Sequence, residues 1–324
     1  MRSEALTVCQ KRRRQSGRVA RDWIMSKFSA EWLCLRERLD SESRATELAA
    51  IAIERLRKNR PRNSPIQVFD LGAGAGANIR YVAPMLPLSQ DWLLVDQDPL
   101  ILDAANRQTR DWAKSSGHWV IECDQRFTIC APWFSCSIKN VCLDLSTSLD
   151  RLAFSDEALI TASALLDLVS EAWLHALAHR AVAAGATVWF ALTYDGRIQL
   201  RPVEPEDLEI RKLFNKHQLS DKGFGAALGP RAGRLCKKVF ANLGYRTWSA
   251  PSHWHLGPAQ HELQRALLDG WFNAACEIAP EKKRRLQRWR DRRYSHITSG
   301  RSEMLVGHVD IVGYPREVLL DTPT

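Results

Sequence analysis

Apolar and polar positions along the chain follow two patterns, short continuous apolar runs and longer stretches with helical spacing. The apolar runs predict strands at 66–70, 92–96, 138–143, 158–163, 187–193, 245–254 and 304–314. Between these runs, apolar residues recur every three or four positions, as in helices that bury one face. Strands without a polar side are typical of a sheet covered by helices on both faces. The pattern therefore predicts a doubly wound α/β fold with a seven-stranded sheet.

The N-terminal part of the chain is predicted to precede this sheet. Residues 1–22 are basic and are expected to form a disordered tail. Residues 23–60 are expected to form two covering helices, the second of which begins at Asp40 or Ser41 as N-cap. The main domain is then expected to span 61–324.

Three segments of the main domain depart from a simple alternation of strands and helices. Residues 119–130 contain two short apolar runs around a polar pair, which predicts a hairpin. Residues 201–230 are polar and rich in glycine, a composition that suits a lid over a substrate. Residues 258–300 show helical spacing and are expected to form a helical insertion before the last strand.

The most distinctive stretch is I-Q-V-F-D-L-G-A-G-A-G at 66–76. A buried strand ends in Asp70, and Gly72, Gly74 and Gly76 follow at alternate positions. Glycines allow a tight turn and let a ligand approach the backbone amides with no Cβ in the way. One interpretation is a dinucleotide-binding loop, although the carboxylate of Asp70 would repel a pyrophosphate and attract an ammonium group.

Read as D-x-G-x-G-x-G, the same stretch resembles motif I of the class I S-adenosylmethionine-dependent methyltransferases. The resemblance implies a Rossmann-like mixed sheet whose last strand is antiparallel to the others, and S-adenosylmethionine as the cofactor. It also implies that Asp70 and the backbone of Gly72, Ala73, Gly74 and Gly76 hold the methionyl part. Helices ahead of the glycine loop suit this family.

Further acidic residues close later strands. Asp96 lies about twenty residues beyond the glycines, where a carboxylate can accept both ribose hydroxyls of an adenosine. The resemblance makes V-D-Q-D-P at 95–99 motif II, with Gln97 beside the ribose. Asp98 is the alternative acid, although the Asp-Pro pair also suits a helix cap. The motif III acid near the adenine is either Asp124 or Asp144.

We select Asp144, with Leu145, as the pair that flanks the adenine, because Asp124 falls in the predicted hairpin. The resemblance also places the end of the fourth strand beside the transferable methyl group. Ser163, Thr161 and Asp167 are the polar side chains nearest to that point along the chain.

Residues that would contact the methyl acceptor follow the fifth strand. Tyr194 and Asp195 are predicted to form a turn at the carboxyl edge of the sheet, where ligands bind in open α/β sheets. His217, in the glycine-rich segment, is the preferred general base. From the helical cover, Arg36 is placed to reach the cofactor carboxylate.

Composition supports a protein of the cytoplasm. The 324 residues are 45% hydrophobic and 26% charged, and no apolar run approaches the ~20 residues of a membrane span. The basic N-terminus lacks the apolar core of a signal peptide. Eight cysteines contain no C-x-x-C pair, so we predict reduced cysteines and no metal site.

The net charge of +9 is concentrated in two runs, Lys11–Arg21 and Lys282–Arg293. Such runs can bind nucleic acid, but a basic tail and a solvated helix face are the preferred interpretation. The predicted activity is therefore direct methyl transfer to a small-molecule acceptor, without a prediction of oligomeric state. An NAD(P)-dependent oxidoreductase, an RNA or DNA methyltransferase and a non-catalytic adenosyl-binding module stay as alternatives.

Overall fold

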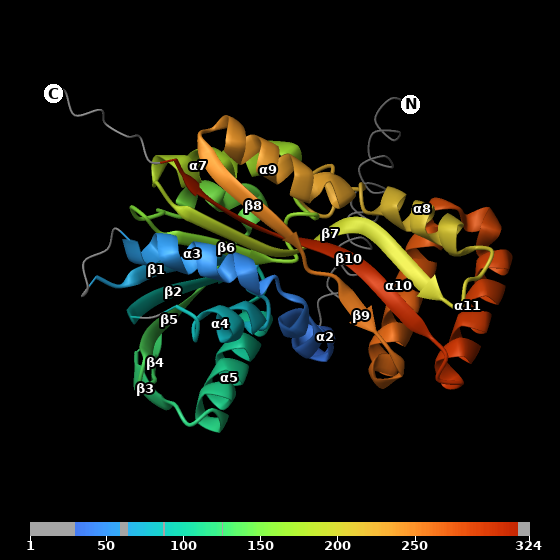
Figure 1. The fold of residues 1–324 in the computed structure, drawn as a ribbon, viewed down its shortest axis with the longest axis horizontal. Helices are drawn as coiled ribbons and strands as arrows, with labels where there is room; N and C mark the ends of the chain where they lie inside the picture. Colours follow the sequence, from blue (N-terminus) through green and yellow to red (C-terminus); the bar gives the residue numbers. More distant parts are fainter. Residues whose placement is uncertain (1–29, 59–63, 87, 125, 317–324) are drawn as a thin grey trace, which may run out of the picture.

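The computed structural model describes residues 30–58, 64–86, 88–124 and 126–316, which form one sheet with helices on both faces (Figure 1). The strands are β1 (Ile66–Leu71), β2 (Leu88–Asp96), β3 (Trp119–Cys123), β4 (Arg126–Cys130), β5 (Phe134–Cys142), β6 (Leu159–Ser163), β7 (Thr187–Arg201), β8 (Tyr245–Pro251), β9 (Trp254–Leu256) and β10 (Glu303–Pro315). The helices are α2 (Ala30–Ser43), α3 (Thr46–Lys58), α4 (Ala77–Val82), α5 (Pro99–Ser115), α6 (Leu145–Ser148), α7 (Glu171–Ala183), α8 (Asp207–His217), α9 (Ala232–Asn242), α10 (His261–Ile278) and α11 (Lys283–Thr298).

The sheet confirms the predicted mixed arrangement. Neighbouring strands follow the order β3-β4-β5-β2-β1-β6-β7-β10-β8, and β9 pairs with β10. The strands from β5 to β7 in this order are parallel, and β10 lies antiparallel between β7 and β8. The described residues contain ten strands instead of seven. The predicted hairpin adds β3 and β4 to one edge, and the strand predicted at 245–254 is divided into β8 and β9.

Helices cover the two faces of the sheet with their apolar sides. On one face, α7 and α9 form a core with the strands, which includes Leu174 and Phe240. On the other face, α3, α4 and α5 form a second core, which includes Ala52, Ile79 and Ala105. Both cores consist of buried apolar side chains, as the continuous apolar runs of the strands require.

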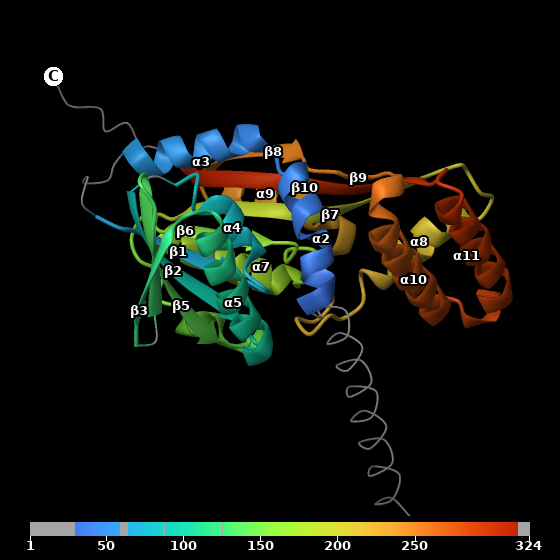
Figure 2. The same cartoon turned by 90° about the horizontal axis from the view of Figure 1, so that it is seen from below.

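A helical lobe extends the fold beyond the sheet. β7 and β10 are 15 and 13 residues long, and both run out of the sheet to the lobe of α8, α10 and α11 (Figures 1 and 2). The lobe has its own core, which includes Trp271, Leu286 and Trp289 together with apolar residues of the two strands. The turn predicted at 194–196 does not end the strand, because β7 continues to Arg201 and pairs with β10 on both sides of an irregularity at which Gly196 has φ 90°.

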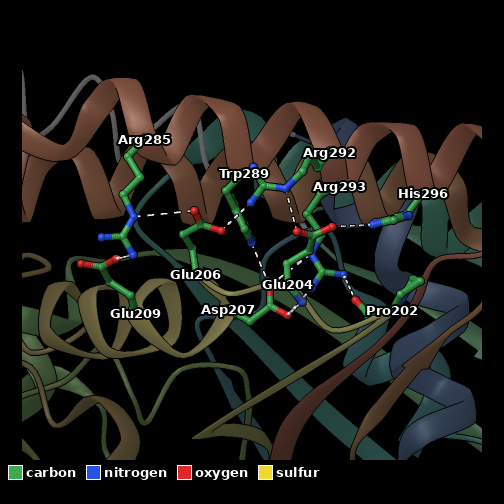
Figure 3. Close-up of polar contacts among 10 residues, drawn as sticks. All are labelled: Pro202, Glu204, Glu206, Asp207, Glu209, Arg285, Trp289, Arg292, Arg293 and His296. Carbon is green, nitrogen blue, oxygen red and sulfur yellow. Dashed lines mark hydrogen bonds and ion pairs between the residues drawn. The ribbon is translucent and has the colours of Figure 1, made fainter.

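An acidic segment between β7 and α8 is bound by basic side chains of α11 (Figure 3). Glu204 accepts from Arg292 Nε at 2.7 Å and lies 2.7 Å from Nε2 of His296. Asp207 pairs with Arg293, whose side chain is fully buried and also donates to the Pro202 carbonyl at 2.6 Å. These contacts fix the lobe to the end of β7.

The acidic residues continue into α8 with Glu209, which contacts Lys282 and Arg285 at 2.8 Å each. The basic run Lys282–Arg293 is therefore not simply a solvated helix face. Part of it is the counter-charge of the acidic segment, which the sequence interpretation did not connect with it because some 80 residues separate the two.

The N-terminal helices also differ from the predicted boundaries. The first predicted helix covers residues 23–39, of which 23–29 lie outside the described residues, and α2 continues to Ser43. Asp40 does not cap a helix, since its carboxylate pairs with Arg36 at 2.7 Å one turn earlier. No helix among the described residues is long and apolar enough to cross a membrane.

Candidate active site

The glycine loop folds around the carboxyl end of β2. Gly72, Gly74 and Gly76 have φ values of 66°, 53° and 82°, which favour glycine. A Cβ at Gly76 would also lie 3.0 Å from atoms of Arg80 and Thr109. The Gly74 amide donates to Asp96 Oδ2 at 3.0 Å, and the Ala73 amide donates to the Val95 carbonyl at 3.0 Å. The loop therefore hydrogen-bonds to the end of the neighbouring strand.

A cavity of about 160 Å³, here called the first cavity, lies against this loop. It collects most of the cofactor residues predicted from the sequence: Gly72, Ala73, Gly74, Asp96, Gln97, Asp144, Leu145 and Ser163. These residues come from the ends of β1, β2, β5 and β6, which is the edge where ligands bind in open α/β sheets. Asp70 and Gly76 are not among its lining residues.

Asp70 lies behind the first cavity rather than in it. Its side chain is fully buried, and Oδ1 accepts a hydrogen bond from Asn78 Nδ2 at 2.7 Å. Burial raises the pKa of this carboxyl to about 7. Asn78 itself lines the cavity, so the amide stands between the carboxylate and a ligand. Asp70 therefore does not line the first cavity itself, and its nearest hydrogen-bonded neighbour at the cavity is Asn78.

Asn78 belongs to a buried polar network that the sequence interpretation missed. Its Oδ1 accepts from Arg44 at 3.0 Å, and its Nδ2 also donates to Thr161 at 3.1 Å. Arg44 pairs with Asp310 at 3.4 Å, and Asp310 accepts from the Leu192 amide at 2.7 Å. The network joins the connection between α2 and α3 to β1, α4, β6, β7 and β10. Asp310 lies 266 positions after its partner Arg44, so no local motif indicates this ion pair.

The acidic residues at the ends of the other strands have different roles in the fold. Asp96 also accepts from the Asp98 amide at 3.1 Å, and burial raises its pKa. Asp98 caps α5 by accepting from the Leu100 amide at 2.9 Å, so it is the helix cap that the sequence allowed. Asp144 lines the cavity and caps α6, whereas Asp124 lies in the turn of the edge hairpin with φ 47°.

Helix α2 closes one side of the first cavity with Arg36 and Asp40. Both are buried, and Trp254 donates to Asp40 Oδ1 at 3.0 Å while its ring lies 5.0 Å from the Arg36 guanidinium carbon. Glu37 on the same helix binds Arg80 of α4 at 2.6 Å. These contacts place α2 against the glycine loop and hold Arg36 at the first cavity.

A second cavity of about 170 Å³ adjoins the first, and the two share Arg36, Ala164, Leu168 and Lys222. Aromatic side chains form much of its wall: Trp32, Tyr194, Phe214, Trp254, Trp271 and the imidazole of His308. Burial lowers the pKa of His308 to about 3, so this ring is neutral near pH 7. The charged side chains that line the second cavity are those of Arg36, Lys222 and Asp167, and Asp167 is the carboxylate among them.

The three residues predicted to contact the acceptor are placed differently from one another. Tyr194 lines the second cavity, and its hydroxyl donates to Asn215 Oδ1 at 2.7 Å. Asp195 pairs with Arg197 of its own strand and lines neither cavity. His217 is buried, and its ring nitrogens lie 3.1 Å from Glu277 Oε2 and 3.2 Å from Lys222 Nζ. His217 thus contacts a cavity residue without lining either cavity.

No protein-family model and no curated protein sequence matches the chain. Solved structures are similar at low identity. The cyclopropane synthase MmaA2 from Mycobacterium tuberculosis is 10% identical, with 83% of each chain covered and a TM-score of 0.39. A geranyl diphosphate methyltransferase in complex with GPP and sinefungin is 11% identical, with 84% of this chain and 78% of that chain covered and a TM-score of 0.41. The YcgJ protein from Bacillus subtilis is 12% identical, with 85% and 100% covered and a TM-score of 0.44.

Proposed function

We propose that the chain transfers the methyl group of S-adenosylmethionine to a small-molecule acceptor in the cytoplasm. The observation that carries this proposal is the pair of adjoining cavities, one built on the glycine loop and one walled by aromatic rings. Because they share four lining residues, two ligands can be held side by side. Direct group transfer needs this proximity of donor and acceptor.

The first cavity suits an adenosyl cofactor better than a dinucleotide. In a loop that binds a pyrophosphate, backbone amides face the phosphate oxygens. Here the Gly74 amide donates to Asp96 instead, and the Gly76 amide donates to the Ala73 carbonyl at 3.0 Å. Asp96 and Asp144 line the cavity and form no ion pair among the described residues, so a pyrophosphate would meet two unpaired carboxylates. These features disfavour an NAD(P)-dependent oxidoreductase.

Different residues of the first cavity can bind the different parts of the cofactor. Asp96 and Gln97 lie where the ribose hydroxyls would be held, and Asp144 with Leu145 lies beside the adenine position. Asn78, backed by Asp70, and the guanidinium of Arg36 would hold the methionyl ammonium and carboxylate. When bound, S-adenosylmethionine supplies a methyl group on a sulfonium, which is already activated for transfer. The chain therefore needs mainly to align the acceptor.

The second cavity supports a small acceptor over a nucleic acid. Its walls are aromatic and apolar, whereas nucleic-acid sites follow the phosphate backbone with rows of lysine and arginine. Lys222 and Phe224 of the glycine-rich segment line the first cavity. We propose that the insertion at 201–230 closes over the two ligands in this way.

The test is calorimetric titration with S-adenosylmethionine, S-adenosylhomocysteine and NADH. We expect the two adenosyl ligands to bind and NADH not to bind. Asp96→Ala should weaken adenosyl binding by about ten- to a hundredfold, the range for losing hydrogen bonds to a charged group. Asp91→Ala, on the same strand but outside both cavities, is the matched control and should bind normally. Binding of NADH alone, or equal affinities of the two variants, would contradict the proposal.

A further inference from the structure

A carboxylate in the second cavity has no role in the proposed cofactor contacts. Asp167 is 6% exposed and lies between β6 and α7, close to Ala164 and Leu168, which line both cavities. Its carboxylate lines the second cavity, and the buried Oδ1 has no hydrogen-bond partner among the described residues. A buried acceptor atom without a donor is costly unless a ligand supplies the donor. Asp167 is therefore placed to accept a hydrogen bond from the acceptor.

Lys222 gives the same cavity a positive charge. Its Nζ donates to Ser220 Oγ at 3.0 Å and lies 3.2 Å from His217 Nδ1. In the part of the chain that the structure describes, it forms no ion pair with a carboxylate within 4.0 Å. Arg36, the other cation of the cavity, pairs with Asp40 and is the residue proposed above to hold the cofactor carboxylate. Lys222 is thus the cation left to face an anionic group of a ligand.

Flat walls surround these two groups. The rings of Tyr194 and Phe214 are 5.6 Å apart between centroids, and those of Phe214 and Trp271 are 6.3 Å apart. Trp254 packs against His308 at 4.9 Å. Aromatic rings gain most from packing against other rings in edge or offset geometry. A planar ligand therefore fits this cavity better than a branched one.

Building on the proposed function, we propose that the methyl acceptor is a hydroxylated aromatic acid. Its ring packs among the aromatic walls, its hydroxyl donates to Asp167, and its acidic group faces Lys222. An alkylammonium acceptor would offer Lys222 no anionic group and would add a second cation beside it. The charges of the cavity thus distinguish this acceptor from an amine of similar size.

The chemical step balances with Asp167 as the base. The acceptor hydroxyl gives its proton to the carboxylate while its oxygen forms a bond to the methyl carbon. The bond from that carbon to sulfur breaks, and its electron pair stays on sulfur. The products are the methyl ether, S-adenosylhomocysteine and one proton held by Asp167, which passes to solvent when the products leave.

Binding to protein saturated with S-adenosylhomocysteine tests this acceptor class. The probes are the three hydroxybenzoate isomers, benzoate, phenol and choline. Their binding is measured by the quenching of tryptophan fluorescence and by calorimetry. We expect one hydroxybenzoate to bind more tightly than benzoate and phenol. Asp167→Asn should weaken that isomer by about tenfold or more while changing benzoate binding little. Lys222→Gln should weaken the hydroxybenzoate and benzoate but not phenol.

Asp269→Asn is the matched control, because Asp269 pairs with Arg290 in the lobe and lines neither cavity. Lys222 lies on a loop, so its variant keeps the test decisive even if Asp167→Asn does not fold. Tighter binding of choline than of every hydroxybenzoate, or no hydroxybenzoate binding at millimolar concentration, overturns the acceptor class. If S-adenosylhomocysteine binds in those experiments, only this inference fails. If it does not bind, the proposed function fails with it.

The pH dependence of methyl transfer to the best isomer gives a second readout. Burial raises the pKa of Asp167 to about 6. The groups around it are Arg36 of α2, Lys222 of the loop after α8, Tyr194 of β7 and His308 of β10. The value of kcat/KM should fall as pH drops below about 6, because the protonated carboxyl no longer accepts the hydroxyl proton. An unchanged acid limb in Asp167→Asn would contradict the role of this carboxylate.

Discussion

Carboxylates gather in two regions of the molecule, and their surroundings are opposite. Around the cavities, burial raises the pKa values of Asp70, Asp96 and Asp167. In the lobe, burial opposes the shift at Glu204, but hydrogen bonds from His296 and Arg292 lower its pKa, and a hydrogen bond from Lys282 lowers that of Glu209. The first region keeps acids in costly surroundings, as ligand sites do, whereas the second uses acids to fix one element to another.

The largest effect on stability is expected in the lobe. Arg293→Ala leaves Asp207 without its buried partner and the Pro202 carbonyl without its donor. We expect the free energy of unfolding to fall by about 3 kcal/mol, the scale for breaking a buried ion pair. Urea denaturation followed by circular dichroism measures this change.

Arg288→Ala is the control for that experiment, because Arg288 is exposed on the same helix and forms no ion pair among the described residues. It should change the free energy of unfolding little. Affinity for S-adenosylhomocysteine should be the same in both variants. A loss of cofactor binding in Arg293→Ala would show that the lobe and the cavities are coupled, and it would contradict their separate roles.

The next effect concerns Asp70 and depends on pH. Its pKa of about 7 in the folded state exceeds the value of about 3.9 in an unfolded chain. The folded state therefore binds the extra proton, and this group lowers stability progressively as pH rises from about 4 to about 7. Asp70→Asn removes that loss, so it should stabilise by about 2–3 kcal/mol more at pH 8 than at pH 5. Parallel urea titrations at the two pH values provide the test, and an equal effect at both would mean that Asp70 titrates normally.

The smallest effect is expected at the partly exposed end of the acidic segment. The side chain of Glu209 is 23% exposed, and its partners Lys282 and Arg285 are 40% and 50% exposed. Solvent and salt screen such pairs, so Glu209→Gln should cost less than about 1 kcal/mol at low salt and less still in 1 M salt. The cost should vanish as pH falls below the lowered pKa of Glu209, because the carboxyl is then neutral in the parent as well. Thermal unfolding at two salt concentrations measures it.

The sequence predicts best what depends on neighbouring residues. The glycine loop, the strand ends at Asp96 and Asp144 and the hairpin at 119–130 are all encoded in short apolar runs and the polar residues that close them. Their positions in the cavity follow because parallel strands bring their carboxyl ends to one edge. This part of the site needs no knowledge of distant contacts.

What the sequence does not reveal depends on partners far along the chain. Asp40 looks like a helix cap until Trp254 and Arg36 are seen to bind it. Residues 194–196 look like a turn until β10, more than 100 residues later, pairs with β7. Asn78 belongs to no recognisable motif, yet it lines the first cavity and hydrogen-bonds to the buried Asp70 behind it.

The pairing of β7 with β10 also determines which walls of the second cavity are rigid. Leu192 and Tyr194 come from one strand, and Val306 and His308 from the other, so these walls are parts of a single hydrogen-bonded ribbon that begins inside the main sheet. Apolar cores pack against this ribbon along its length, and these contacts oppose its bending. Under the proposed function, we expect the ribbon to select ligands by shape, and we expect the ligand to enter past α2 and the loop that carries Lys222.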